Sequence, residues 1–280
     1  MIKSIYFPGK EFTTKEELFV DLRTNVNKII ACKTAETYKS FEKGSINIPT
    51  GFLIKQSGEA EKVGPQMKDN CIYPVINTTK YLDSHGDVHL DGIWDTSAKQ
   101  QQGKLYYVCD HEIKTNTIIA WPQDVSVMVK SVPWSWVGKD YTGNTEALIY
   151  EIDKSNIVNA DAKKIIDEKR PVQNSVRMQY VKINLGMNST DKEDIQYKAY
   201  WDKHIESIAN KEVAEAQGYF FGVEEAKIIR EGSMVPLGSN DATPIRQKDT
   251  VADTITTEKI EPENPSTHKK ETNFINPNLF

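Results

Sequence analysis

Histidine is the side chain that most often moves a proton near neutral pH, and the sequence contains five. His111 follows an apolar run at residues 105–108 and meets a polar turn, so a strand end would aim its side chain at a substrate. Ser175 follows a turn at residues 171–174 and opens another alternating run, which would expose its hydroxyl where a strand begins. A serine with a histidine as its base can perform acyl transfer. Taken singly, each position is more typical of a surface residue than of a catalytic one.

Two further histidines invite a metal interpretation, because His85 and His89 flank Asp87 and imidazole with carboxylate is a common ligand set. Glycine and aspartate in this segment oppose a helix, so only a strand would place the three side chains on one face. A polar turn between strands is the preferred interpretation, and the sequence predicts neither a metal nor an organic cofactor. His204, in a charged helix, and His268, in a polar tail, are interpreted as exposed.

Composition and missing motifs exclude several classes of protein. With a net charge of -5, the chain lacks the concentrated positive surface that nucleic-acid binding needs. It has no G-x-S-x-G elbow, glycine-rich phosphate loop or dinucleotide fingerprint. Its 3 widely spaced cysteines fit a reducing compartment rather than a disulfide scaffold or a CxxC metal site. No signal-peptide core and no run of about 18 apolar residues is present, so we expect a soluble protein.

The first 45 residues are predicted to form an appendage. A short strand and a turn at residues 8–9 precede a helix, whose start is indicated by Thr13 and Thr14, each with a glutamate three residues later. An apolar stripe follows at helical spacing: Leu18, Leu22, Val26 and Ile29 or Ile30. We interpret residues 1–45 as an amphipathic unit that docks on its own body or on a partner.

Residues 46–237 are predicted to form the main domain, which is rich in strands. After a connector at 46–70, short apolar or alternating runs predict strands at residues 51–54, 73–76, 105–108, 117–121, 125–132, 147–152, 174–185 and 219–235. Helical patterns are found at 197–217 and at 159–169, the latter capped by Asn159 or Asp161. In the strand at 174–185, alternation groups Ser175, Arg177, Gln179 and Val181 on one face, and Val176, Met178, Tyr180 and Lys182 on the other. This pattern favours an α+β fold, a β-barrel flanked by helices.

The composition changes at residue 238, where polar and charged residues begin to dominate. Such a segment buries too little apolar surface to offset its ordering entropy, so residues 238–280 are predicted to be a flexible, disordered tail. Its last seven residues, 274–280, are more apolar and form either a docking peptide or a frayed terminus.

Four segments, taken in order, resemble those of the prohead (capsid maturation) serine proteases of tailed phages. DSHGDVHLDGIW at residues 83–94 is similar to the family's D-x-x-G-D-V-x-x-x-G-A-F segment, and CDHE at 109–112 resembles its N-H-D or D-H-E segment. NSVRM at 174–178 is similar to its S-x-G-F strand. IREGSMVP at 229–236, with SNDA at 239–242, resembles L-x-E-V-S-L-V-P followed by A-N. The resemblance covers roughly residues 73–245.

This resemblance implies a fold like that of the herpesvirus assemblins, a small β-barrel flanked by helices. It assigns His111 as the base and Ser175 as the nucleophile, and the 64 residues from one to the other leave room for several strands. The implied activity is cleavage of scaffold and major capsid protein segments, and self-cleavage, within the procapsid in the host cytoplasm. The resemblance is compatible with a homo-oligomer and implies no nucleic-acid or membrane partner.

The third catalytic residue and the role of Arg177 stay open. Glu231 matches the family's acidic position, 56 residues beyond Ser175, while Glu224 and Glu225 are rivals. Arg177 departs from the family's glycine and is in phase with Ser175 along the strand, so it binds substrate, stabilises an oxyanion or lies at the surface. Two alternatives from another class are a catalytically inactive structural virion protein with the same barrel, and a scaffold-type assembly protein that uses its two ends as binding arms.

Overall fold

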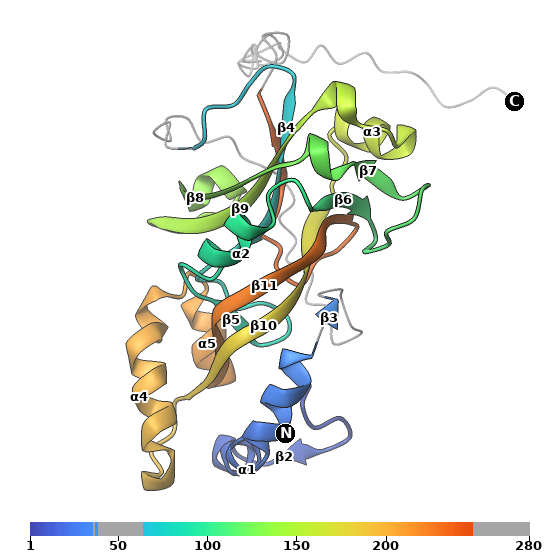
Figure 1. Ribbon diagram of the computed structural model, residues 1–280. Helices are drawn as coiled ribbons and strands as arrows, with labels where there is room; N and C mark the ends of the chain where they lie inside the picture. Colours follow the sequence, from blue (N-terminus) through green and yellow to red (C-terminus); the bar gives the residue numbers. More distant parts are fainter. Residues whose placement is uncertain (36, 39–63, 249–280) are drawn as a thin grey trace, which may run out of the picture. The chain divides into compact units, whose positions relative to one another are not determined.

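Two long antiparallel strands, β10 (Gln173–Met187) and β11 (Tyr219–Val235), form the centre of the fold. They run side by side through the computed structural model, which describes residues 1–35, 37–38 and 64–248 (Figure 1). Apolar side chains along both strands, such as Val176, Met178 and Ile228, enter the main core. The strand predicted at residues 51–54, residues 249–280 of the predicted tail, and His268 lie outside the described residues.

The other elements are shorter. The strands are β1 (Ile2–Lys3), β2 (Glu11–Phe12), β3 (Thr37–Tyr38), β4 (Cys71–Thr78), β5 (Asp87–His89), β6 (Tyr106–Cys109), β7 (Ile118–Ala120), β8 (Ser126–Pro133), β9 (Asn144–Asp153) and β12 (Ile245–Gln247). The helices are α1 (Lys15–Thr34), α2 (Asp95–Gln100), α3 (Ala160–Asp167), α4 (Ile195–His204) and α5 (Lys211–Gln217). Among them, the α1 and α3 starts and the strands β4 and β6–β11 confirm the sequence predictions, whereas β5 and α2 were not predicted.

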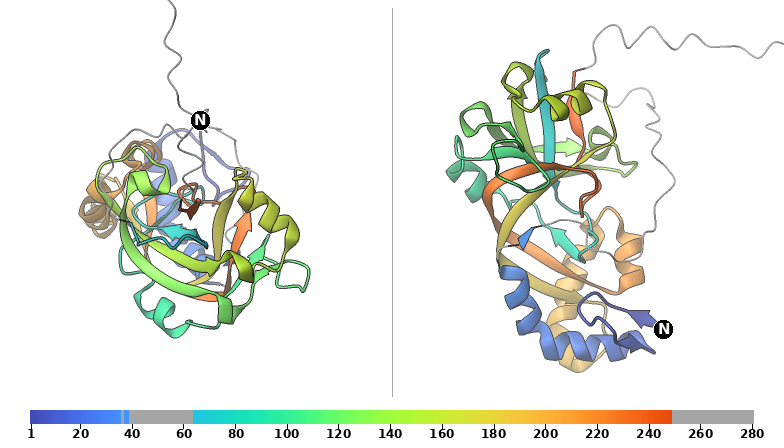
Figure 2. Two further views of the ribbon diagram at one scale, coloured as in Figure 1. Left: turned by 90° about the horizontal axis from the view of Figure 1, so that it is seen from above. Right: turned by 90° about the vertical axis from the view of Figure 1, so that its right-hand side faces the viewer.

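Three sheets are built from these strands. The largest has the order β3-β10-β11-β6-β7, with β5 also paired to β11, and the second has the order β12-β4-β9-β8. A two-stranded ribbon of β1 and β2 is the third. Ile72 and Ile76 of β4 and Tyr150 of β9 share one core with Val176 of β10, so the two larger sheets enclose the same apolar interior. Figure 2 shows these strands from two further directions.

The fold class is α+β, as predicted, but no sheet of the described residues closes into a barrel. The two larger sheets share no ladder of paired strands. They are linked at one edge by the segment before β12, where the Asn174 N–H donates to the Thr243 carbonyl at 3.0 Å and the Val75 N–H donates to the Pro244 carbonyl at 2.9 Å. A short connection of this kind joins the sheets without continuing the strand pairing.

The N-terminal helix begins with the predicted capping residues. Thr14 Oγ1 accepts the Glu17 N–H at 3.3 Å, and the Glu17 carboxylate accepts the Thr13 N–H at 2.8 Å. This reciprocal arrangement satisfies two N–H groups that a helix start otherwise leaves unbonded. The predicted stripe is also confirmed, because Leu18 and Leu22 are buried in the same core as β10.

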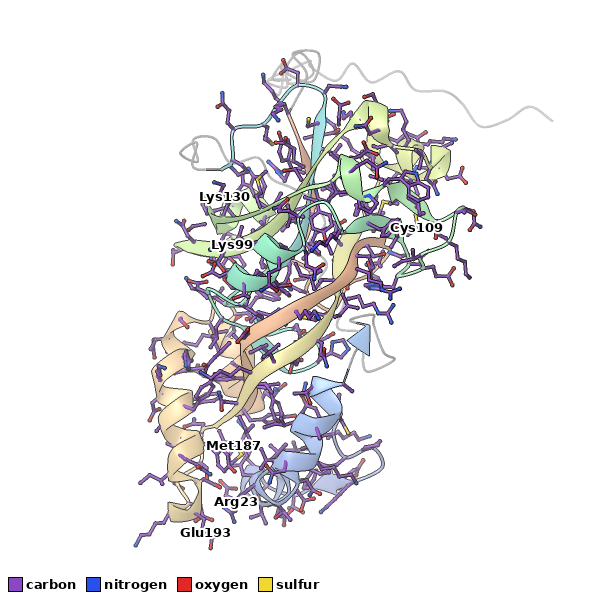
Figure 3. All side chains as sticks on the ribbon, in the orientation of Figure 1. Arg23, Lys99, Cys109, Lys130, Met187 and Glu193 are labelled. Atoms are coloured by element: carbon purple, nitrogen blue, oxygen red, sulfur yellow. The ribbon has the colours of Figure 1, made fainter. Side chains whose placement is uncertain are left out.

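The predicted appendage therefore docks on its own chain, within a unit that spans Met1–Lys248. Near its C-terminal end, Lys33 Nζ lies 2.5 Å from Asp87 Oδ1 of β5, and both side chains are buried or nearly so. Nearer its start, Arg23 forms ion pairs with Glu193 at 2.8 Å and with the buried Asp194 at 2.7 Å (Figure 3). These charged contacts fix α1 against β5 and against the start of α4.

Two details of the predicted secondary structure were wrong. The helix predicted at residues 197–217 is interrupted between α4 and α5, because Ile208 is buried and the Ala209 N–H donates to the Lys80 carbonyl at 2.8 Å. Along β10, the predicted alternation holds as far as Tyr180. Irregular pairing around Lys182 then shifts the phase, so Lys182 is exposed whereas Val176, Met178 and Tyr180, predicted on the same face, are buried.

The polar C-terminal segment also begins later than predicted. Residues 238–248 belong to the compact unit, and β12 pairs antiparallel with β4. Asn240 and Thr243 are buried, and the Asn240 amide donates to the Thr78 carbonyl at 3.1 Å. Polar side chains in this segment are thus held by hydrogen bonds rather than by apolar packing, which composition alone does not reveal.

Candidate active site

His111 lies just beyond β6, in a tight turn. β6 runs parallel to β11, with Cys109 opposite Met234. Asp110 and His111 then adopt φ values of 51° and 59°, the left-handed region that residues with a Cβ rarely occupy. The Asp110 N–H donates to the Met234 carbonyl at 3.0 Å, and the Glu112 N–H donates to the Cys109 carbonyl at 3.1 Å. This turn directs His111 back toward β11.

Glu231 is presented by a bulge in β11. Val176 pairs with Gly232 and Met178 pairs with Ile228, so a single residue of β10 faces the three residues 229–231 of β11. Arg230, within the bulge, has a φ of 65°. A bulge bends its strand and redirects its side chains. Here Glu231 is fully buried on a strand that lies between β10 and β6.

His111 and Glu231 meet through their side chains, with 2.8 Å between His111 Nδ1 and Glu231 Oε1. An ionised carboxylate can only accept a hydrogen bond, so it pairs in this contact with the imidazole tautomer that carries its proton on Nδ1. The neutral ring then has its lone pair on Nε2, which is the atom that can act as a base. Both side chains are buried, so the contact is shielded from bulk water.

Ser175 is held rigidly at the start of β10. The preceding residue, Asn174, is tied on both sides: its side-chain oxygen accepts the Tyr107 hydroxyl at 2.7 Å, and its carbonyl accepts the Thr243 hydroxyl at 2.8 Å. Ser175 itself is 5% exposed and pairs directly with Ser233 of β11. These bonds fix the backbone from which the serine hydroxyl projects.

The strand register places Ser175 and Glu231 on one face of the sheet. Ser175 is the cross-strand partner of Ser233, and the Cβ atoms of such pairs lie about 4.5–5.5 Å apart on the same face. Ser233 in turn follows Glu231 by two residues, so their side chains also share a face. The His111 N–H donates to Ser233 Oγ at 2.9 Å. His111 is thus joined to β11 by two contacts, with Glu231 at its ring and with Ser233 at its main chain, and Ser175 lies opposite Ser233.

Apolar and aromatic packing surrounds this arrangement. Between Glu231 and Ser233, an added Cβ on Gly232 would lie 2.8 Å from Tyr150 Cε2 and 2.9 Å from Ile76 Cδ1, so only glycine fits there. Burial, and next the charge of Glu231, raise the pKa of Tyr150 well above its usual value. Tyr150 therefore stays neutral beside the carboxylate and adds no competing negative charge.

The rival acidic residues lie elsewhere on β11. The Glu224 carboxylate accepts hydrogen bonds from Asn184 at 3.0 Å and from the Tyr200 hydroxyl at 3.2 Å, and it is ion-paired with Lys182. Glu225 stands opposite Lys182 in the strand pairing. Of the three candidate acids, Glu231 is the one that has a hydrogen bond with His111.

Arg177 lies two residues beyond Ser175 on β10, is half-buried, and pairs through its backbone with Tyr38 of β3. Strand alternation places its side chain on the face of Ser175, as predicted. A role for its guanidinium in binding substrate or an oxyanion stays a prediction.

The segment with His85 and His89 is a turn followed by a buried strand. The Asp83 carboxylate accepts the His85 and Asp87 N–H groups at 2.8 and 2.9 Å, which forms the predicted polar turn. β5 then pairs with β11, and the two ring nitrogens of His89 lie 3.1 Å from Asn77 Oδ1 and 3.2 Å from the Tyr180 hydroxyl. Within residues 1–35, 37–38 and 64–248, no three His, Cys, Asp or Glu side chains gather in a way that could hold a metal ion.

His204 differs from the expectation of full exposure. Its ring lies 4.6 Å from the ring of Tyr200, and partial burial lowers its pKa from the usual value.

The sequence did not reveal three residues that build the site: Ser233, Gly232 and Asn174. Ser233 and Gly232 occur in the segment that resembles the protease family, but their tasks depend on neighbours that are distant in sequence. Asn174 stands between Gln173 and Ser175, so its own stretch of sequence does not distinguish it as a residue with a buried hydrogen bond.

The fold and the site define an α+β chain in which adjoining strands gather a serine, a histidine and a glutamate. Comparisons with protein-family models, with curated proteins and with solved structures give no significant match. Among the described helices, none is both long and apolar enough to cross a membrane.

Proposed function

We propose that this chain is a serine endopeptidase of the prohead maturation type, with Ser175 as nucleophile, His111 as base and Glu231 as the acid that orients the imidazole. The observation that carries the proposal is the buried contact of 2.8 Å between His111 and Glu231, on the face of the sheet where Ser175 begins β10. The proposal includes the relation to the assemblin-like barrel that the sequence segments suggest. Its substrates are extended segments of scaffold and coat proteins, and of the chain itself, within the procapsid.

The proposed reaction proceeds through an acyl-enzyme. His111 Nε2 takes the hydroxyl proton as Ser175 Oγ attacks the carbonyl carbon of the peptide bond. The same proton then passes to the departing nitrogen, the C–N bond breaks, and an ester to Ser175 is left. Water, deprotonated by His111, cleaves that ester and restores the serine hydroxyl. Throughout the reaction, Glu231 accepts a hydrogen bond from the His111 Nδ1–H. It thereby stabilises the imidazolium that forms once during acylation and once during hydrolysis of the ester.

The negative charge on the attacked carbonyl oxygen also needs donors. In such reactions one donor typically contributes about 10²–10³ in rate. Arg177 follows Ser175 by two residues on β10, and we propose that it assists there or in binding the substrate. The reaction as proposed requires no metal or organic cofactor.

The test combines a serine-directed probe with intact mass measurement. Purified wild type, Ser175→Ala and His111→Ala are incubated with a fluorophosphonate, and separately alone and with the scaffold and coat proteins encoded beside the chain. Wild type is expected to gain one label on Ser175 and to produce discrete fragments, and both variants to do neither. Ser131→Ala, which removes an exposed serine of β8, should behave as wild type.

Two outcomes reject the proposal. An unlabelled and uncleaved wild type, even with the assembly partners present, favours the structural alternative. Fragments produced equally by all variants indicate a contaminating protease.

A further inference from the structure

The backbone of His111 adopts a conformation that needs support. Asp110 and His111 are consecutive residues with positive φ, at 51° and 59°, and neither is glycine. A left-handed backbone is costly for residues with a Cβ, and it persists where the surroundings hold it in place. The position of the imidazole depends directly on this backbone, because the ring is attached to the second of the two residues.

The Ser233 hydroxyl provides that support from β11. Its Oγ accepts the His111 N–H at 2.9 Å, and it lies 3.3 Å from the Val108 carbonyl, to which it can donate. The Ser233 hydroxyl therefore connects Val108, near the end of strand β6, to the main chain of His111. Ser233 is fully buried, so its hydroxyl has no access to solvent.

One short stretch of β11 thus holds His111 at two points. Glu231 contacts the ring at Nδ1, and Ser233, two residues later, accepts the main-chain N–H. The contact with Ser233 restrains the backbone of His111, and the contact with Glu231 restrains the rotation of its ring. Ser175 stands directly across from Ser233, so any shift of His111 changes its approach to the serine.

We infer that Ser233 is a positioning residue of this site, which holds the main chain of His111 so that the imidazole faces Ser175. This inference rests on the proposed function. Ser233 is not itself the proposed nucleophile, because its hydroxyl already accepts the His111 N–H and lies within donating distance of the Val108 carbonyl. A misplacement of about 1 Å in a catalytic group can reduce a rate by about 10². Loss of the hydroxyl should therefore slow the reaction of Ser175 without weakening the binding of a small probe.

The chain contains a matched control for this hydroxyl. Ser97 is also buried, and its Oγ accepts the Ile228 N–H of β11 at 2.8 Å. Ser97→Ala and Ser233→Ala each remove a buried hydroxyl that accepts a main-chain N–H on or beside the same strand. The two changes should lower thermal stability to a similar degree, so a difference between them in reactivity reports on the site.

The experiment measures fluorophosphonate labelling of the full chain, as the maximal rate kinact and the half-saturating concentration KI, for wild type, Ser233→Ala and Ser97→Ala. We expect kinact of Ser233→Ala to fall by about 10- to 100-fold with KI within about twofold, and Ser97→Ala to keep both constants. The low-field proton resonance of the His111 Nδ1–H should shift or broaden in Ser233→Ala alone. If Ser233→Ala does not fold, Ser233→Cys, whose sulfur is a weaker acceptor, is measured instead and should also be slower than wild type.

The inference is overturned if the Ser233 variant keeps the kinact of wild type and an unchanged Nδ1–H resonance while Ser175 is still labelled. That result leaves the proposed function intact. A wild type that is not labelled, or a label that peptide mapping places on Ser233, overturns the proposed function and this inference with it.

Discussion

Replacing Glu231 by glutamine is the most informative single change, because it keeps the shape of a fully buried side chain and removes its charge. In wild type, Glu231 Oε1 lies 2.8 Å from His111 Nδ1. A hydrogen bond to a charged group contributes about 1.5–3 kcal/mol. At an effective dielectric constant of about 20, unit charges 2.8 Å apart interact by about 6 kcal/mol, which sets an upper limit. At about 1.4 kcal/mol per tenfold change, the acylation rate should fall by about 10-fold to 10⁴-fold.

A second effect acts in the same direction. The glutamine amide can present its NH₂ group to Nδ1, which would favour the tautomer with the proton on Nε2 and leave no base facing Ser175. The assay is the rate of fluorophosphonate labelling at neutral pH, with thermal unfolding measured in parallel. The control is Glu146→Gln, which alters a half-buried carboxylate of β9 that accepts the Gly92 N–H at 2.8 Å, away from His111. If Glu231→Gln is labelled on Ser175 as fast as Glu146→Gln, Glu231 does not orient the base.

Two further predictions concern buried or partly buried groups outside the three proposed catalytic residues. Lys33→Met removes the ammonium that lies 2.5 Å from the buried Asp87 carboxylate. Urea unfolding should therefore show a free energy of unfolding lower by about 3–5 kcal/mol. The control Lys10→Met removes one partner of a more exposed ion pair with Asp21, and it should lower the free energy of unfolding by less than about 1 kcal/mol. Equal losses would contradict this difference. Burial raises the pKa of the Cys109 thiol to about 11, so the thiolate forms only as pH rises toward that value. Iodoacetamide at pH 8 should modify the exposed Cys32 before Cys109. The modification rate of Cys109 should rise about tenfold per pH unit up to about pH 11. Equal modification rates of Cys32 and Cys109 at pH 8 would refute the raised pKa.

Much of the secondary structure follows from local sequence patterns. β11 was predicted with its observed bounds, and the capping pattern at Thr14 predicted the start of α1. The predictions failed where contacts between distant segments decide the conformation. β5 is the clearest case, because Asp87 and His89 look like turn residues and are nevertheless buried. Their polar atoms are satisfied by Lys33, Tyr180 and Asn77, which no local pattern brings together.

The candidate residues of the site were named from the family resemblance, but their arrangement could not be predicted. His111 and Glu231 lie 120 residues apart, and Glu224 and Glu225 on the same strand were rivals to Glu231, which matches the family's acidic position. What decides among them is the bulge at residues 229–231 and the left-handed turn at Asp110. Neither feature contains a glycine at its positive φ position, so the usual sequence marker of such backbone was missing.

Several unfavourable features of the fold lie beside His111 and Glu231, and they support the proposal of an enzyme over the structural alternative. Arg230, Asp110 and His111 have positive φ values although none of them is glycine. Arg230 precedes Glu231 in the chain, and His111 contacts Glu231 through its ring. Glu231 is itself fully buried, and in the described part of the chain its Oε2 has no hydrogen-bond partner. A carboxylate removed from water with one oxygen unsatisfied costs folding free energy, and a chain selected only for packing would replace it with an apolar residue. Strained backbone and a costly buried charge meet where β11 faces both Ser175 and His111, which is the combination expected when chemistry, not stability, fixes the residues.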